Sequence, residues 1–265
     1  MTKNFKPLIA YLLSIIALSC STENEKNPIK PKMKKLMRVN VNQPRLDYEK
    51  ECSFNYNSDN RISEINETTT YNKIQNTTKI NFNYQNDTIV SAKIYSTENI
   101  VYFKKFNYSN GNLAETITYT TEGVEKSRNE YLYSSNKKVI SFKKYQENQL
   151  IVMAENMVYG IDENIAGVEG KNVSFEFDRN PSPYEYLSYT DKIIFSIEAS
   201  PYDIFSKNNL IRQEFIGDED YLNGLITITE VAIQYDSDNY PIIKKSTLTA
   251  NGQKTDEVSY TYSYE

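Results

Sequence analysis

The sequence contains no histidine and no tryptophan, and it has only two cysteines among its 265 residues. Without histidine, Ser-His-Asp and Cys-His nucleophile systems, His-liganded zinc and imidazole acid–base catalysis are excluded. Without tryptophan, the ring that most often stacks on sugars is missing. We therefore expect no catalytic residues, no metal site and no cofactor, and we do not expect the chain to be an enzyme.

The first cysteine closes a segment with the layout of a bacterial lipoprotein signal peptide. Lys3 and Lys6 precede an apolar run over residues 8–18, which a serine and Cys20 follow. As a helix this run rises about 16 Å, about half of a bilayer's hydrocarbon core, so it is too short to span a membrane. We predict that residues 1–19 are a signal peptide and that Cys20 is lipidated, which would hold the chain to a membrane. The alternative is an ordinary secretory signal with an incidental cysteine.

Residues 20–45 are predicted to form the lipidated cysteine and a flexible tether. The stretch is polar and highly charged, and Pro28 and Pro31 interrupt it, so it buries too little apolar surface to offset its ordering entropy. Glu23 and Glu25 resemble the short acidic surface-export signal of Bacteroidota lipoproteins. We therefore expect a protein of the cell envelope that is anchored to the outer membrane by lipid and exposed at the cell surface, with the periplasmic side as the alternative.

Charge and cysteine content limit the partners of the remaining chain. After loss of Lys3 and Lys6 it would carry 28 basic and 35 acidic residues, a net charge near −7. A mildly acidic chain without a basic block does not suit nucleic acid, so we expect no nucleic-acid partner. Lipidation of Cys20 leaves Cys52 without a disulfide partner. Strand alternation places Cys52 beside Phe54, where a small buried apolar side chain is expected.

An internal repeat dominates the rest of the sequence, which has 23 tyrosines but only 8 glycines and 8 prolines. Each copy has an aromatic–polar–aromatic triplet, a short turn of Asn, Asp or Ser, and then an aliphatic pair. Asn, Asp and Ser tolerate left-handed turn geometry, so they replace glycine in tight turns. The copies are separated by 28, 24 and 25 residues at first, and they begin at Phe54, Phe82, Phe106 and Tyr131, with further copies at Phe175, Ile233 and Tyr260.

This repeat predicts a mainly β fold. Period-two alternation marks each arm as a strand with one buried face, so each copy is a β-hairpin and successive hairpins should pair as an antiparallel meander. We expect residues 46–265 to form a single β domain. The rhythm fails over about residues 153–230, where we expect a small irregular or helical insert that covers part of one sheet face, with short helical turns or packing loops at residues 184–189 and 202–205.

Three segments carry a likeness to a known family. Tyr235–Ile242 reads Tyr-Asp-Ser-Asp-Asn-Tyr-Pro-Ile, and Asp178–Tyr184 reads Asp-Arg-Asn-Pro-Ser-Pro-Tyr; Ser206–Asn209 follows as a return loop. With the anchor segment, they resemble a Bacteroidota lipoprotein family of unknown function, built of β-hairpin units related to the YD repeats of Rhs-type surface proteins. The resemblance covers residues 46–265 and implies a hairpin-repeat fold. The family has no assigned activity, so it implies no catalytic residue.

Tyrosines outside the core of the repeat are candidates for ligand contact. Exposed rings on one sheet face could form a flat platform for a glycan or a protein partner. The alternative is that the tyrosines only form the buried face of the repeat. The platform candidates are Tyr95, Tyr102, Tyr119 and Tyr145.

Acidic clusters offer two further hypotheses. Asp236, Asp238 and Asn239 could offer oxygens to calcium, but the later Glu and the bend Gly of a calcium loop are missing, so an ordinary turn is expected. Asp218-Glu219-Asp220 could supply paired carboxylates to a histidine-free glycoside hydrolase. Our leading interpretation is a lipid-anchored envelope β protein with a binding or scaffolding role, and a carbohydrate-active enzyme is the alternative.

Overall fold

The computed structural model describes residues 34–86, 88–154, 156–187, 192, 201–217 and 225–265. The chain divides into Met1–Lys32 and Met33–Glu265, and the description below concerns the second unit. Cys20, the predicted signal peptide and Asp218-Glu219-Asp220 lie outside the described residues. No helix among the described residues is long and apolar enough to cross a membrane.

Fifteen strands form one antiparallel sheet. Its order is β10-β9-β8-β7-β6-β5-β4-β3-β2-β1-β17-β16-β15-β14-β13, so consecutive strands are neighbours almost throughout. The first half comprises β1 (Leu36–Gln43), β2 (Tyr48–Tyr56), β3 (Ile62–Tyr71), β4 (Ile74–Gln85), β5 (Thr88–Ser96), β6 (Asn99–Ser109), β7 (Asn112–Thr120), β8 (Glu125–Tyr133), β9 (Val139–Gln146) and β10 (Gln149–Ala154). The second half comprises β13 (Val173–Pro181), β14 (Asn208–Ile216), β15 (Ile226–Tyr235), β16 (Pro241–Ala250) and β17 (Gln253–Tyr264).

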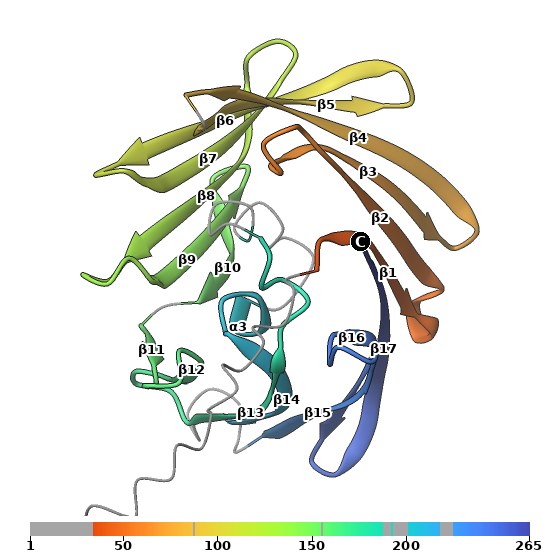
Figure 1. Ribbon diagram of the computed structural model, residues 1–265, viewed down its shortest axis with the longest axis vertical. Helices are drawn as coiled ribbons and strands as arrows, with labels where there is room; N and C mark the ends of the chain where they lie inside the picture. Colours follow the sequence, from red (N-terminus) through yellow and green to blue (C-terminus); the bar gives the residue numbers. More distant parts are fainter. Residues whose placement is uncertain (1–33, 87, 155, 188–191, 193–200, 218–224) are drawn as a thin grey trace, which may run out of the picture. The chain divides into compact units, whose positions relative to one another are not determined.

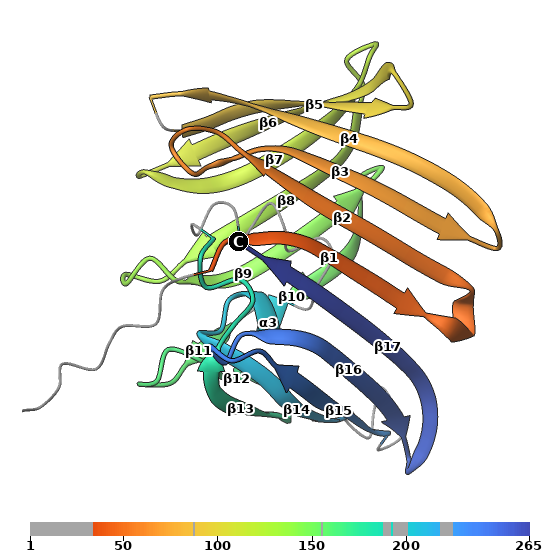
Figure 2. The ribbon, with the colours of Figure 1, turned by 45° about the vertical axis from the view of Figure 1, so that its right-hand side comes forward.

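The remaining elements are short. β11 (Met157–Tyr159) and β12 (Ile165–Val168) form a separate two-stranded sheet, η1 (Pro44–Leu46) is a 3-10 turn, and α3 (Pro201–Ile204) is one helical turn. The large sheet follows an arc, and α3 lies on its inner side (Figures 1 and 2). The predicted fold class, a mainly β antiparallel meander, is confirmed.

Cross-strand pairing separates an inner from an outer sheet face. Partners that lie opposite each other point to the same side of a sheet. Phe54 pairs with Ile65, and Ile65 pairs with Ile80, so these side chains share the inner face. The inner face and the elements that cover it form one buried cluster, whose members include Leu36, Val39, Cys52, Phe54, Ile62, Ile65, Ile89, Phe106, Leu113, Tyr131, Val139, Phe142, Tyr184, Leu187, Ile204 and Phe205.

Asn and Asp side chains close several of the tight turns. Asn57 Oδ1 accepts hydrogen bonds from the backbone N–H of Asp59 at 3.0 Å and of Arg61 at 2.9 Å. Asp236 Oδ1 likewise accepts hydrogen bonds from the backbone N–H of Asp238 at 2.9 Å and of Tyr240 at 3.0 Å. The last residue of such a turn adopts positive φ, as Asn239 does at 66°. These oxygens serve the turns themselves, in agreement with the turn interpretation of the sequence.

A repeated hydrogen bond explains why the second aromatic residue is a tyrosine in several of the hairpins. Among the described residues, six tyrosine hydroxyls donate to a backbone carbonyl that lies 19 to 23 residues earlier, over distances between 2.5 and 2.9 Å. A carbonyl at or next to the start of a strand therefore accepts a hydrogen bond from a tyrosine that comes later in the sequence. We call these bonds the tyrosine latches; they join Tyr56 to Leu36, Tyr84 to Ile62, Tyr108 to Ile89, Tyr133 to Leu113, Tyr159 to Val139 and Tyr264 to Pro241.

The predicted tether boundary at residue 45 is wrong, because β1 lies between β2 and β17 inside the sheet. Val39 pairs with Cys52 on one side and with Tyr262 on the other, and it is 2% exposed. Arg38 and Asn40 alternate with it on the outer face and give the segment its polar composition. The polar residues therefore concealed a strand whose apolar positions recur with period two.

The boundaries of the predicted insert are also wrong. β13 and β14 lie within residues 153–230 but belong to the large sheet, and β15 begins there as well. Pro181 fits at the end of β13 because that strand is at the sheet edge, where a missing N–H donor is tolerated. Among the described residues, the part of the insert outside the large sheet includes β11, β12, the turn at residues 182–187 and α3. α3 overlaps residues 202–205, one of the two segments predicted as helical turns or packing loops.

Candidate ligand-binding cavity

The four candidate platform tyrosines do not form one surface. Tyr95, Tyr119 and Tyr145 are half-buried on the outer face, because their cross-strand partners there are Lys79, Phe103 and Arg128. A cation from a neighbouring strand covers each ring: Lys79 at 5.5 Å, Lys105 at 5.3 Å and Arg128 at 5.0 Å from the ring centroids of Tyr95, Tyr119 and Tyr145 respectively. Such contacts stabilise the sheet surface and occupy the ring faces that a ligand would stack on.

Tyr102 lies on the opposite face from the other three. It pairs with Ile94 and with Thr120, whereas Tyr119 pairs with Phe103 on the outer side. The structure therefore separates Tyr102 from the proposed platform. Whether any of the four rings contacts a ligand stays a prediction.

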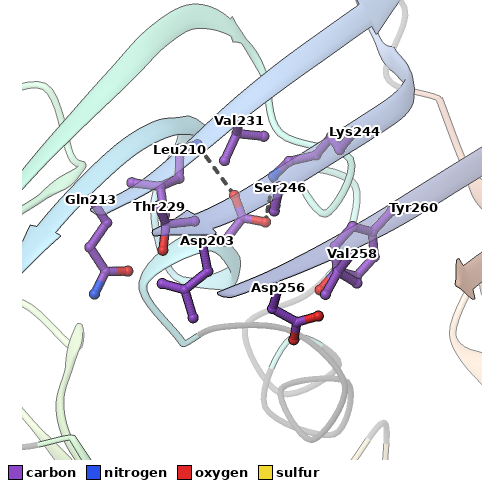
Figure 3. Close-up of a pocket in the computed structure, with 11 residues that line it drawn as sticks. Asp203, Leu210, Gln213, Thr229, Val231, Lys244, Ser246, Asp256, Val258 and Tyr260 are labelled. Carbon is purple, nitrogen blue, oxygen red and sulfur yellow. Dashed lines mark hydrogen bonds and ion pairs between the residues drawn. The ribbon is translucent and has the colours of Figure 1, made fainter. Parts of the chain in front are cut away.

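A cavity of about 230 Å³ lies between α3 and the inner face of β14–β17 (Figure 3). Both apolar and polar side chains line it. They come from inner-facing positions, which recur at every second residue of these strands. Mixed walls of this kind are typical of small-molecule sites. The lining consists of Asp203, Leu210, Gln213, Thr229, Val231, Lys244, Ser246, Leu248, Asp256, Val258 and Tyr260.

A buried ion pair forms one wall of the cavity. The ammonium of Lys244 on β16 lies 2.6 Å from Asp203 Oδ2 on α3, and the two side chains are 4% and 10% exposed. Asp203 Oδ1 also accepts the backbone N–H of Leu210 at 3.3 Å. Removing two charges from water costs more than their attraction commonly returns, so the pair is not explained by fold stability alone. It presents a fixed donor and a fixed acceptor to the cavity.

The remaining polar groups enlarge this set of donors and acceptors. Thr229 and Ser246 offer hydroxyls, and Gln213 offers an amide. Asp256 accepts hydrogen bonds from the Gln43 side chain and from the next backbone N–H, the latter at 2.8 Å. The cavity can therefore form several hydrogen bonds to one small hydrophilic group while its apolar wall packs against a carbon skeleton.

The two cavity carboxylates are both engaged by neighbours, Asp203 by Lys244 and Asp256 by Gln43. A glycosidase pair needs one carboxylate as proton donor and one free to attack or to activate water. Neither carboxylate of the cavity is therefore without a partner, as the attacking or water-activating group of such a pair would be. The acidic cluster that suggested a glycosidase lies outside the described residues.

Sequence reasoning missed this cavity. The signal was present in β16, where Lys244 and Ser246 alternate with Lys245, but alternation alone does not tell which lysine faces inward. The register with β17 decides it, because Lys244 pairs with Tyr260 on the inner face. The acceptor, Asp203, comes from a helical turn 41 residues away, which no local pattern identifies.

The inner face is polar beyond the cavity as well. Lys104 pairs with Thr118, and Thr118 pairs with Ser127, so a row of polar side chains crosses β6, β7 and β8. Burial lowers the pKa of Lys104 to about 8, with Glu67 opposing the shift and Lys144 adding to it. This part of the inner face is therefore polar, in contrast to the apolar cluster beside it.

The outer face carries charged networks. Arg128 lies 3.9, 3.8 and 3.4 Å from carboxylate oxygens of Glu115, Glu125 and Glu130. Across the sheet, Arg212 has three glutamate partners of its own, Glu176, Glu214 and Glu230. Charged groups at the centre of a bilayer cost several kcal/mol, about 2–4 for Arg or Lys on a lipid-facing strand. This face therefore matches contact with water.

Comparison with known proteins gives a likeness of fold. No model of a protein family matches the sequence, and no curated protein matches it. A porin-like protein from Bacteroides uniformis shares 11% identity at a TM-score of 0.56, over 87% of this chain and 98% of that one. A porin-like protein from Bacteroides vulgatus shares 8% identity over 88% of this chain and 99% of that one, at a TM-score of 0.30, and no argument depends on it. At 11% identity the first likeness shows the fold alone.

Proposed function

We propose that this chain is a lipid-anchored β protein of the cell envelope with a binding role, and that the cavity between α3 and β14–β17 holds a small hydrophilic ligand. A sugar residue of a glycan fits the volume and the mixture of hydroxyl, amide, carboxylate and ammonium groups. The buried Asp203–Lys244 pair at the cavity wall carries this proposal.

Two further observations support the envelope location. The segment that ends at Cys20 has the order of a lipoprotein signal peptide. The fold resembles that of a porin-like protein from Bacteroides uniformis. The charged outer face argues for a sheet that stands in water beside the membrane, held by its lipid, and against a wall that contacts lipid.

The test begins with a glycan array probed with the soluble chain from residue 21 onward, followed by calorimetric titration of any glycan that binds. Ser246→Leu should fill the cavity and weaken binding by about tenfold or more, because it removes a polar partner and the space for the ligand. Lys245→Met is the matched control, since Lys245 is the next residue of β16 but is 52% exposed on the outer face. Equal affinity of the Ser246→Leu chain would exclude the cavity as the site, and release of reducing ends from the glycan would overturn the non-enzyme assignment.

A further inference from the structure

A second groove lies at another part of the unit, where three turns meet. The β8–β9 turn contributes Lys137 and Lys138, the β11–β12 turn contributes Glu163, and the segment that follows α3 contributes Lys207. Its volume is about 360 Å³. Since none of these residues lines the Asp203–Lys244 cavity, the groove is a separate feature.

Positive charge exceeds negative charge in this groove. Four lysines line it, with Lys192 as the fourth, against the two carboxylates of Glu163 and Glu185. Lys138 and Lys207 share Glu163 as a partner, at 3.6 and 3.7 Å. These separations exceed those of a charge-assisted hydrogen bond, which are about 2.7–2.9 Å, so the single carboxylate satisfies neither ammonium fully. Within the described part of the chain, no carboxylate oxygen lies within 4.0 Å of the Lys137 ammonium.

The walls of the groove are held in place before any ligand arrives. The backbone N–H of Asn208 donates to Asn164 Oδ1 at 2.9 Å, and the side-chain amide of Asn164 donates to Asn208 Oδ1 at 3.0 Å. These two bonds join the β11–β12 turn to the start of β14. The backbone N–H of Ile165 donates to Ser206 Oγ at 3.1 Å and adds a second connection. A preformed site loses less conformational entropy on binding than a flexible one.

Lys138 is restrained by its surroundings. Lys138 places its ammonium 4.9 Å from the centroid of the Tyr159 ring, and the Tyr159 hydroxyl is latched to the carbonyl of Val139. The groove also contacts Phe205, which is 4% exposed, so part of its wall is apolar. Electrostatic attraction is stronger beside an apolar wall than in open water.

We propose that this groove binds a tetrahedral oxyanion, namely a phosphate or sulfate ester group, on its converging lysines. A phosphate monoester dianion matches the excess of two positive charges, a sulfate ester carries one negative charge, and both accept several N–H donors at once. Lysine ammonium groups act as point charges that adapt to a tetrahedral anion. The site is independent of the proposed sugar cavity, so failure of one proposal leaves the other standing.

Proton binding gives the site a characteristic pH dependence. Burial lowers the pKa of Lys192 to about 8, with Lys138 adding to the shift, while Glu185, Asp203 and Glu163 oppose it. Above this pKa the lysine loses its charge, so affinity for sulfate should fall between pH 7 and pH 9.5. Sulfate keeps its charge over this range, and the Lys192→Met chain should lose most of this dependence.

The test uses calorimetric titration of the chain from residue 21 onward with inorganic phosphate and with sulfate at constant ionic strength. Lys207→Met should weaken binding by about fivefold to tenfold, because it removes one favourable charge contact. That factor corresponds to about 1 kcal/mol or slightly more. Glu163→Gln should tighten binding by about threefold or more, because it removes the competing carboxylate. Glu122→Gln, an identical change in an exposed turn, is the control and should leave the affinity unchanged.

The opposite responses of Lys207→Met and Glu163→Gln distinguish a site from general charge attraction. If the Glu122→Gln chain tightens as much as the Glu163→Gln chain, or if no saturable binding occurs, the proposal is overturned. Competition against phosphate by a sulfated disaccharide and by vesicles that contain a lipid phosphate monoester then identifies the source of the ester group. The stronger competitor is the physiological class.

Discussion

At the scale of single residues, the tyrosine latches link neighbouring repeats. Each latch places a phenol hydroxyl on the carbonyl of a residue at or next to the start of a strand, and Leu36, Ile62, Ile89 and Val139 among these carbonyl residues have 0% exposed surface. A second donor on a buried carbonyl is worth about 1 kcal/mol in a folded protein. The abundance of tyrosine therefore has a specific structural cause in addition to its preference for strands.

Removal of one hydroxyl tests this explanation. Tyr133→Phe keeps the ring but deletes the 2.7 Å bond to the Leu113 carbonyl, so the free energy of unfolding should fall by about 1 kcal/mol. Tyr119→Phe is the control, since the Tyr119 hydroxyl has no hydrogen bond within the described residues, and its loss should be within about 0.3 kcal/mol. Urea denaturation of both variants measures the difference. Equal midpoints for the two variants would contradict the latch.

The sequence placed five of the six latching tyrosines in repeat copies, all except Tyr159, but it did not predict the latches. The spacing of aromatic–polar–aromatic triplets identified Tyr56, Tyr84, Tyr108 and Tyr133 as repeat positions, because strand alternation is local. The acceptor lies 19 to 23 residues away, and its position depends on the register of two hairpins. The same limitation concealed the Asp203–Lys244 pair, whose members are 41 residues apart.

At the scale of secondary-structure elements, β1 is the strand that the sequence concealed. It pairs with β2 along one side and with β17 along the other, so it is an internal strand of the sheet. Both backbone edges of an internal strand are hydrogen-bonded, and its loss leaves two ladders unpaired. Leu36 and Val39, which are 0% and 2% exposed, would be removed from the core with it.

Truncation tests the role of β1 directly. A chain that begins at residue 34 should unfold in one cooperative thermal transition, whereas a chain that begins at residue 46 should aggregate or lack that transition. Circular dichroism melting and size-exclusion chromatography of the two chains make the comparison. A monomeric, cooperatively folded 46–265 chain would restore the tether boundary predicted from the sequence.

The insert shows why element boundaries were harder to predict than the fold class. Phe175 and Phe177 match the aromatic positions of the repeat, which predicts a strand, and β13 does belong to the large sheet. Three prolines between residues 181 and 201 and the loss of regular spacing favoured an irregular assignment for the whole region. Pairing of β13 with β14 and of β14 with β15 overrode those local signals.

At the scale of the whole molecule, the proposed anchor and the charged outer face together predict that the lipid alone holds the protein to the membrane. If the lipid on Cys20 is what holds the chain to the membrane, then Cys20→Ala should move the protein from the membrane fraction to the soluble fraction and abolish its labelling with radioactive palmitate. Two acyl chains give durable attachment, whereas the ion-paired Arg128 and Arg212 on the outer face disfavour contact of the sheet with lipid. A Cys20→Ala protein that stays with carbonate-washed membranes would show that the sheet itself binds lipid.

The pairing of β1 with β17 also governs when the molecule can assemble. Lys35 and Glu265 exchange backbone hydrogen bonds at 3.1 and 3.0 Å, and Leu36 pairs with Tyr264, so strands that are far apart in the sequence are neighbours in the middle of the sheet. During synthesis β1 therefore keeps one unpaired edge until β17 has been made. Pairing over such a long sequence separation is slow, and the open edge is exposed to aggregation in the meantime.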